Sequence, residues 1–124
     1  MTEPPRQTGL DTLWQPFADK VLGVLAALKA DGFDPIVYEA LRSQERQTWL
    51  YGVGRTHDLG RKPVTWVRHS KHQDGRAADI ISKAHGWSSD EFFDALAAQA
   101  RHWGLRDYRG GISWDGDRAH IQAQ

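Results

Sequence analysis

The sequence contains no cysteine among its 124 residues. This absence excludes a disulfide framework, a thiolate nucleophile, an iron–sulfur cluster and any metal site built on sulfur. A metal site in this chain must therefore use histidine nitrogens and carboxylate oxygens. Six histidines are available: His57, His69, His72, His85, His102 and His120.

The sequence also lacks an excess of either charge. Lysine and arginine total 16, and so do aspartate and glutamate, which makes the formal net charge zero. Surfaces that bind nucleic acid are usually strongly basic, so we expect no nucleic-acid partner. No apolar run approaches the ~18 residues that a membrane span needs, and we expect no membrane association.

The beginning of the chain is polar and carries two adjacent prolines. It lacks the basic and apolar regions of a signal peptide, so we expect synthesis in the cytoplasm. The length fits one domain, since domains typically hold ~100–150 residues. We expect a flexible lead-in over residues 1–9 and a single domain over residues 10–124, acting as a monomer.

The pattern of apolar residues predicts a mixture of helices and strands. Apolar residues spaced by three and four predict an amphipathic helix from about Leu10 to Ala30. Pro16 favours a start near Trp14, and Gly32 favours an end there. The other predicted elements are a strand over 36–41, a helix over 44–53 capped by Ser43, an irregular segment over 54–75, a strand over 77–82, a helix over 88–103 with Trp103 in its buried stripe, and a hairpin over 112–122 around Asp115-Gly116. Because the order is not a regular β-α-β alternation, the predicted class is α+β with a small sheet.

Two polar segments beside predicted strands, residues 70–79 and residues 117–120, carry side chains that can bind a metal. In the first, His72 and Asp79 would lie ~10.5 Å apart on a straight helix, too far to share one ion. Gly75 lies between them and allows the chain to reverse. With His120 from the second segment, these residues would give two histidines and one carboxylate, and Asp117 could then act as a general base.

Spacing alone leaves other interpretations open. His72 can be a surface-loop residue, Asp79 and Asp117 can be turn carboxylates, and His120 can be a half-buried strand residue. His69 and Asp74 are rival ligands, because His69 is also three residues from His72.

The motifs around these residues resemble the zinc metallopeptidases of family M15, which include D-alanyl-D-alanine carboxypeptidases and L-alanyl-D-glutamate endopeptidases. Their first zinc motif has the form Ser-x-His-x-x-Gly-x-Ala-x-Asp, as in 70–79 here. Their second motif is an acidic residue, two others and His, which matches 117–120 after the Gly-Gly-x-x-Trp stretch at 110–114. An upstream Arg-Ser segment is matched by Arg42-Ser43. The resemblance covers roughly residues 35–123.

The resemblance implies a role for each matching residue. His72, Asp79 and His120 would bind Zn²⁺, and Asp117 would be the general base that activates water. Arg42 would steady the oxyanion or a substrate carboxylate, although a salt bridge with Glu39 or Glu45 is the alternative. The remaining substrate-binding candidates are Ser70, for which a turn role is equally open, and Trp114, for which core packing is the alternative.

The chain departs from the family pattern in the second motif. Ala119 replaces the usual proline and Ile121 the usual aromatic residue, and neither change affects the metal chemistry. Asp117 is a glutamate in some members, and the shorter side chain favours the endopeptidase branch.

The resemblance therefore implies a hedgehog/DD-peptidase-like fold and a zinc-dependent peptidoglycan hydrolase of endolysin type. The expected substrate is a stem peptide cut between L-Ala and D-Glu, reached in the cell wall after release from the cytoplasm. A D-alanyl-D-alanine carboxypeptidase is the nearest alternative. A non-catalytic zinc-binding domain is a further one, although a structural site has no need of the base at Asp117.

Overall fold

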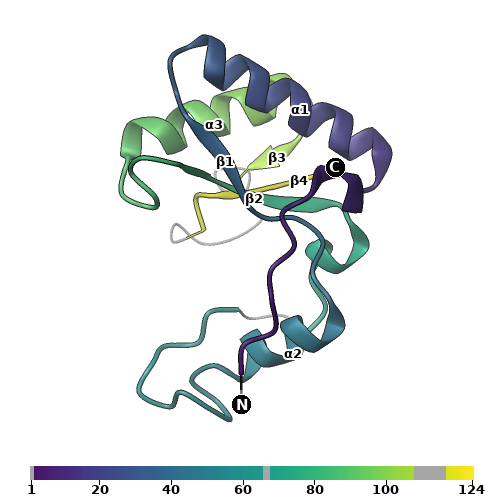
Figure 1. The fold of residues 1–124 in the computed structure, drawn as a ribbon, viewed down its shortest axis with the longest axis vertical. Helices are drawn as coiled ribbons and strands as arrows, with labels where there is room; N and C mark the ends of the chain where they lie inside the picture. Colours follow the sequence, from purple (N-terminus) through teal and green to yellow (C-terminus); the bar gives the residue numbers. More distant parts are fainter. Residues whose placement is uncertain (1, 66–67, 108–116) are drawn as a thin grey trace.

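A computed structural model describes residues 2–65, 68–107 and 117–124 of the chain. Its four-stranded sheet has the order β1-β2-β4-β3, and every neighbouring pair is antiparallel. Figure 1 shows helices α1 and α3 on one side of the sheet, with α2 and the long loop after it on the other side. The α+β class with an antiparallel sheet is confirmed. The elements are η1 (Leu10–Thr12), α1 (Gln15–Ala30), β1 (Pro35–Glu39), α2 (Gln44–Gly52), η2 (Lys71–Asp74), β2 (Ala77–Ser82), α3 (Asp90–His102), β3 (Arg106–Asp107) and β4 (His120–Gln122).

Helix α1 begins and ends where its sequence predicts. Pro16 lies in the first turn, where a missing N–H costs nothing, and Trp14 is the N-cap. Gly32 follows the helix with φ +89°, and the N–H of Phe33 returns to the carbonyl of Leu28 at 3.0 Å. This left-handed cap turns the chain toward β1. The buried face of α1 consists of Phe17, Ala18, Val21, Val24, Leu25 and Leu28.

Helix α3 packs beside α1 over the same face of the sheet. Ser89 caps it by accepting a hydrogen bond from the N–H of Phe92 at 3.2 Å. The predicted burial of Trp103 is wrong, because this residue follows the last helical turn and its side chain stays 39% exposed. Its ring lies across α1 instead, where a Cβ on Gly23 would come within 2.4 Å of it. The other predicted residues of the stripe are buried: Phe92, Phe93, Leu96, Ala97 and Ala100.

Strand β2 lies between β1 and β4 in the sheet. All six of its residues are buried, and its bounds agree with the predicted strand over 77–82. Ala78 and Ile80 belong to the hydrophobic core under the two helices. Since side chains alternate across a strand, Asp79 faces the opposite side, toward α2.

The segments around the sheet are less regular. Residues 54–75 contain the short helix η2, as an otherwise irregular segment would allow. The first strand and the turn of the predicted C-terminal hairpin fall within 108–116, outside the described residues, while β4 forms as predicted and pairs with β2 and β3. None of the helices in the described ranges is both long and apolar enough to cross a membrane.

The lead-in of residues 2–9 runs past α2 toward the sheet (Figure 1). The carbonyl of Gln7 accepts a hydrogen bond from the N–H of Ala40 at 2.7 Å. Nearer the start, Arg46 of α2 donates to the carboxylate of Glu3 at 2.8 Å and to the carbonyl of Pro4 at 2.9 Å. The lead-in is therefore bound both to the residue that follows β1 and to α2.

Candidate metal centre

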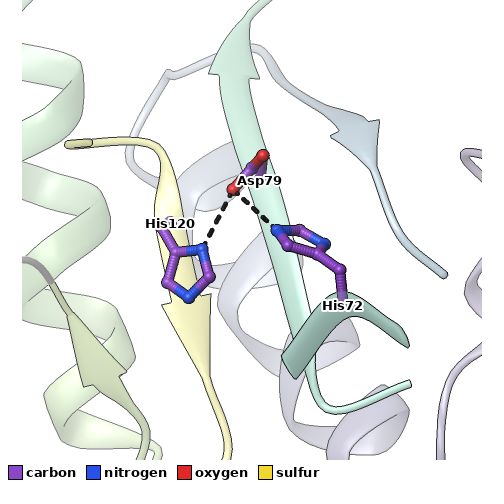
Figure 2. Close-up of side chains that lie close together, drawn as sticks. All are labelled: His72, Asp79 and His120. Atoms are coloured by element: carbon purple, nitrogen blue, oxygen red, sulfur yellow. Dashed lines mark ion pairs between the residues drawn. The ribbon is translucent and has the colours of Figure 1, made fainter. Parts of the chain in front are cut away.

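Three side chains from three separate elements converge on the face of the sheet opposite α1 and α3. His72 comes from η2, Asp79 from β2 and His120 from β4 (Figure 2). Oδ1 of Asp79 lies 3.3 Å from Nε2 of His72 and 3.3 Å from Nδ1 of His120. One ligand atom from each residue lies within 4.8 Å of the others, so the group could hold a metal ion.

The strand register brings two of these residues together. Asp79 on β2 is directly opposite His120 on β4, and directly opposite Glu39 on β1. Paired residues of antiparallel strands place their side chains on the same face, with Cβ atoms ~4.5–5.5 Å apart. The side chains of Glu39, Asp79 and His120 therefore form one row across the sheet.

Helix η2 delivers His72 to this row. The Oγ of Ser70 accepts from the N–H of His72 at 3.1 Å, and the side chain of Gln73 accepts from the N–H of Ser70 at 2.9 Å. The side chain of Ser70 also accepts from the backbone of Gln73, and Ser70 and Gln73 thereby form a capping box, so the turn role of Ser70 is present in the structure. Gly75 then reverses the chain with φ +68°, and a Cβ there would lie 3.0 Å from the backbone nitrogen of Trp14.

The hydrogen bonds of the two imidazoles indicate which nitrogen carries the proton. Nδ1 of His72 is 2.9 Å from the carbonyl oxygen of Ala40, which can only accept, so Nδ1 donates. Nε2 of His120 similarly faces Oε1 of Gln122 at 2.9 Å. The remaining lone pair of each ring then points at Asp79. This outward donation is the arrangement that orients metal-binding histidines.

A bound cation would give the converging polar atoms the partner that they lack. Nε2 of His72 and Oδ1 of Asp79 are both buried, and neither has a hydrogen-bond partner. Buried polar atoms without partners cost ~1–3 kcal/mol each, so such a pair requires an explanation. Two imidazole nitrogens and one carboxylate oxygen are a ligand set that zinc accepts, with a fourth position left for water. The residues present therefore fit the ion that the motifs imply.

The charges in the row favour the ionised carboxylate. Burial penalises the charged form of Asp79, but the imidazoles of His72 and His120 outweigh that penalty and hold the pKa of Asp79 below its usual range. Burial also disfavours protonated His120, yet the carboxylate of Asp79 at 3.3 Å and the nearby charge of Asp117 raise its pKa. Without a metal, a proton therefore takes the place of the cation between the two residues.

Asp117 lies beside the predicted ligands. A turn joins it to β4, with the N–H of His120 donating to the carbonyl of Asp117 at 3.2 Å. Its Oδ2 is 3.9 Å from Nδ1 of His120, the same nitrogen that faces Asp79, and 31% of its side chain is exposed. A carboxylate here can reach a water held at the centre of the group.

Arg42 approaches the same group from the loop between β1 and α2. Its Nη2 donates to Oε1 of Glu39 at 2.8 Å and is 3.8 Å from Oδ2 of Asp79, while Nη1 donates to Oε1 of Gln47 at 2.7 Å. The salt bridge with Glu39 that the sequence leaves open is therefore present. Each terminal nitrogen of the guanidinium still has a second N–H, so the pairing does not exhaust its donors.

These residues line a cleft of about 650 Å³ between the sheet and α2. Its wall also includes Tyr38 and Trp87, whose rings meet edge to face with centroids 5.1 Å apart. Trp114, the aromatic predicted to bind substrate, falls within 108–116, outside the described residues. The rival ligands His69 and Asp74 bind each other at 2.9 Å on the exposed side of η2.

Two buried charged residues of the cleft are not predicted from the sequence. The sequence suggests Glu39 only as an alternative partner of Arg42, and it suggests no role for Arg46. Both are buried, at 1% and 3% exposure, and they bind each other. A glutamate inside the apolar run Ile36–Leu41 was the available signal, because a charge at a core-facing position needs a buried partner.

No protein-family model and no curated protein sequence matches this chain. Several solved structures share its fold. The LdcB LD-carboxypeptidase superposes with a TM-score of 0.67 at 18% identity, over 90% of this chain and 58% of its own. The vancomycin-resistance D,D-pentapeptidase VanY, in a mutant form with Zn(II), gives 0.67 at 22% identity, over 90% and 72%. The Serratia marcescens L-Ala D-Glu endopeptidase ChiX gives 0.62 at 23% identity, over 98% and 92%.

At these identities the likeness establishes the fold. The chain spans little more than half of LdcB, and nearly all of ChiX. The DD-peptidase-like fold that the motifs imply is thereby confirmed.

Proposed function

We propose that this chain is a zinc-dependent peptidase that hydrolyses stem peptides of peptidoglycan. The observation that carries the proposal is the convergence of ligand atoms from His72, Asp79 and His120 at an open cleft, with Nε2 of His72 and Oδ1 of Asp79 left without a hydrogen-bond partner. Peptidases of peptidoglycan among the structures of the same fold support it, and so does the Zn(II) in VanY. The protein would meet this substrate in the cell wall after release.

The three ligands would hold zinc through Nε2 of His72, a carboxylate oxygen of Asp79 and Nδ1 of His120. A bound zinc ion supplies a Lewis acid, and it lowers the pKa of a coordinated water from 15.7 toward ~7. The carbonyl of Ala40 and the side chain of Gln122 accept hydrogen bonds from the two imidazoles and fix the orientation of the rings.

Asp117 and Arg42 would carry out the proton transfer and the charge stabilisation. Asp117 accepts a proton from the attacking water and returns it to the leaving amine as the peptide bond breaks. Arg42 donates N–H groups to the substrate oxygen as negative charge develops on it, which is the task of an oxyanion-binding group. The guanidinium suits this role because it remains charged and its donors are fixed in one plane.

The charge distribution in the cleft favours an endopeptidase that cuts between L-Ala and D-Glu. A carboxypeptidase needs a cation for the free terminal carboxylate of its substrate. In the described part of the cleft, the two buried arginines, Arg42 and Arg46, already share the carboxylate of Glu39, and Arg46 also binds Glu3. The other cations that line it, Arg61 and Lys71, are exposed to solvent. Substrates that continue on both sides of the scissile bond need no such unpaired cation.

The test uses Asp117→Asn and, as a matched control, Asp19→Asn on the exposed side of α1. We expect zinc binding by both variants, and hydrolysis of a stem pentapeptide by the control alone. Mass spectrometry of the digest identifies the bond: a new N-terminal D-Glu indicates the endopeptidase, and loss of D-Ala indicates the carboxypeptidase. Hydrolysis by Asp117→Asn at the wild-type rate would remove Asp117 as the base.

A further inference from the structure

We infer that Glu39 is a positioning residue whose carboxylate holds the guanidinium of Arg42 in place over the cleft. The inference rests on the proposed function, because Arg42 is the residue on which Glu39 would act.

The carboxylate of Glu39 has both oxygens engaged. Oε1 accepts from Nη2 of Arg42 at 2.8 Å, and Oε2 accepts from Nε of Arg46. Only 2% of the Glu39 side chain is exposed, so water does not compete for these bonds. Burial disfavours the charged carboxylate, but the hydrogen bonds from the two arginines lower the pKa of Glu39, and the group stays ionised.

Strand β1 places Glu39 beside the proposed metal ligands. It is the partner of Asp79 in the β1–β2 ladder, and the register shifts between Val37 and Glu39. Such a shift re-aims the side chain that follows it. Glu39 therefore ends β1 in the same row as Asp79 and His120.

Glu39 also keeps Arg42 away from a competing partner. Oδ2 of Asp79 is only 3.8 Å from Nη2 of Arg42, and the Nε of Arg42 is buried without a hydrogen-bond partner. A long charged side chain freed from Glu39 would therefore turn toward the ligand carboxylate. With Glu39 and Gln47 each holding one terminal nitrogen, the guanidinium is pinned at two points and its remaining N–H groups stay available.

The test compares Glu39→Gln with Glu45→Gln, an identical change on the exposed first turn of α2. We expect Glu39→Gln to lower kcat about tenfold, the scale of one lost charge-assisted hydrogen bond, with little change in KM. Glu45→Gln should change neither constant. In an Arg42→Lys background, Glu39→Gln should cause less than about a twofold further loss, because coupled residues are not additive. An equal loss in both backgrounds overturns the inference, since it shows that Glu39 acts independently of Arg42.

A second measurement does not depend on hydrolysis. In ¹⁵N spectra of the labelled protein, the buried Nε–H of Arg42 should exchange slowly with solvent in the wild type and in Glu45→Gln. We expect exchange at least about tenfold faster in Glu39→Gln. Local opening around Arg42 then costs less free energy, because the ion pair with Glu39 no longer has to break. Unchanged exchange overturns the inference, whereas failure of the wild type to cut stem peptides overturns the proposed function alone.

Glu39→Asp keeps the test decisive if Glu39→Gln does not fold. Aspartate retains the negative charge between the two arginines but withdraws the carboxylate by one methylene. Faster exchange of the Arg42 Nε–H in this variant supports the positioning role, and unchanged exchange contradicts it.

Discussion

Zinc should stabilise the folded protein strongly, because it would replace an unsatisfied cluster with coordinate bonds. A ligand that binds only the folded state stabilises it by ~4 kcal/mol when its free concentration is a thousand times its Kd. For 124 residues the entropy of unfolding is about 0.26 kcal/mol/K, so this stabilisation raises Tm by about 16 °C.

The contribution of a single ligand can be measured in the same way. His72→Gln removes one nitrogen donor from the group and keeps a polar side chain of similar length. If affinity falls a thousandfold at the same zinc concentration, only ~0.4 kcal/mol of stabilisation remains, or less than about 2 °C. His102→Gln changes an exposed histidine at the end of α3 and is the matched control.

The assay is thermal unfolding followed by circular dichroism, on protein first stripped with a chelator and then titrated with zinc. The wild type and His102→Gln should show the full increase in Tm, and renewed chelation should reverse it. Magnesium should not replace zinc, because it prefers six oxygen ligands. An equal increase in His72→Gln would refute the assignment, because zinc would then bind elsewhere.

Three further outcomes follow from the geometry. The raised pKa of His120 means that its ion pair with Asp79 stabilises the metal-free protein fully below pH ~6.5 and is lost as pH rises through that raised pKa; zinc affinity should rise over the same range, as measured by chelator competition. Gly75→Ala should cost ~2 kcal/mol or more in urea unfolding, because φ is +68° and the new Cβ meets backbone at 3.0 Å. Gly32→Ala, with φ +89° and open space around it, should cost less. Arg42→Lys should lower kcat about a hundredfold while zinc remains bound.

Each outcome has a result that contradicts it. A metal-free Tm that does not change between pH 6 and 9 would show that the His120–Asp79 pair adds no stability. Equal costs at the two glycines would mean that the backbone near Trp14 yields easily. Wild-type kcat in Arg42→Lys would assign that residue to the salt bridge with Glu39 alone.

Much of the fold follows from local signals that the sequence carries. Ser43 and Ser89 each cap a helix by accepting from the third following N–H, and such caps depend only on neighbouring residues. The alanines and isoleucines that make up four of the six residues of β2 likewise predict a buried strand with correct bounds. Trp103 shows the limit of the helical pattern, because its position after the last turn depends on where α3 ends.

The site depends on contacts that the local pattern does not contain. The meeting of Asp79 with His120 is a matter of register between strands about 40 residues apart in sequence, and short motifs do not specify register. Motif resemblance supplied the three candidate ligands, whereas the row that continues to Glu39 emerges only from the β1–β2 pairing. Arg46 is similar, since its partner Glu3 lies 43 residues away in sequence and its partner Glu39 belongs to a different element.

The anchoring of the lead-in has a practical consequence for engineering. Glu3 lines the cleft, and the two ends of the chain lie far apart in Figure 1. A purification tag or targeting module joined ahead of residue 2 would emerge beside the cleft and pull on the contacts of Arg46. The same addition after Gln124 would leave these contacts of Arg46 intact, so fusions of this domain are better made at the carboxyl end.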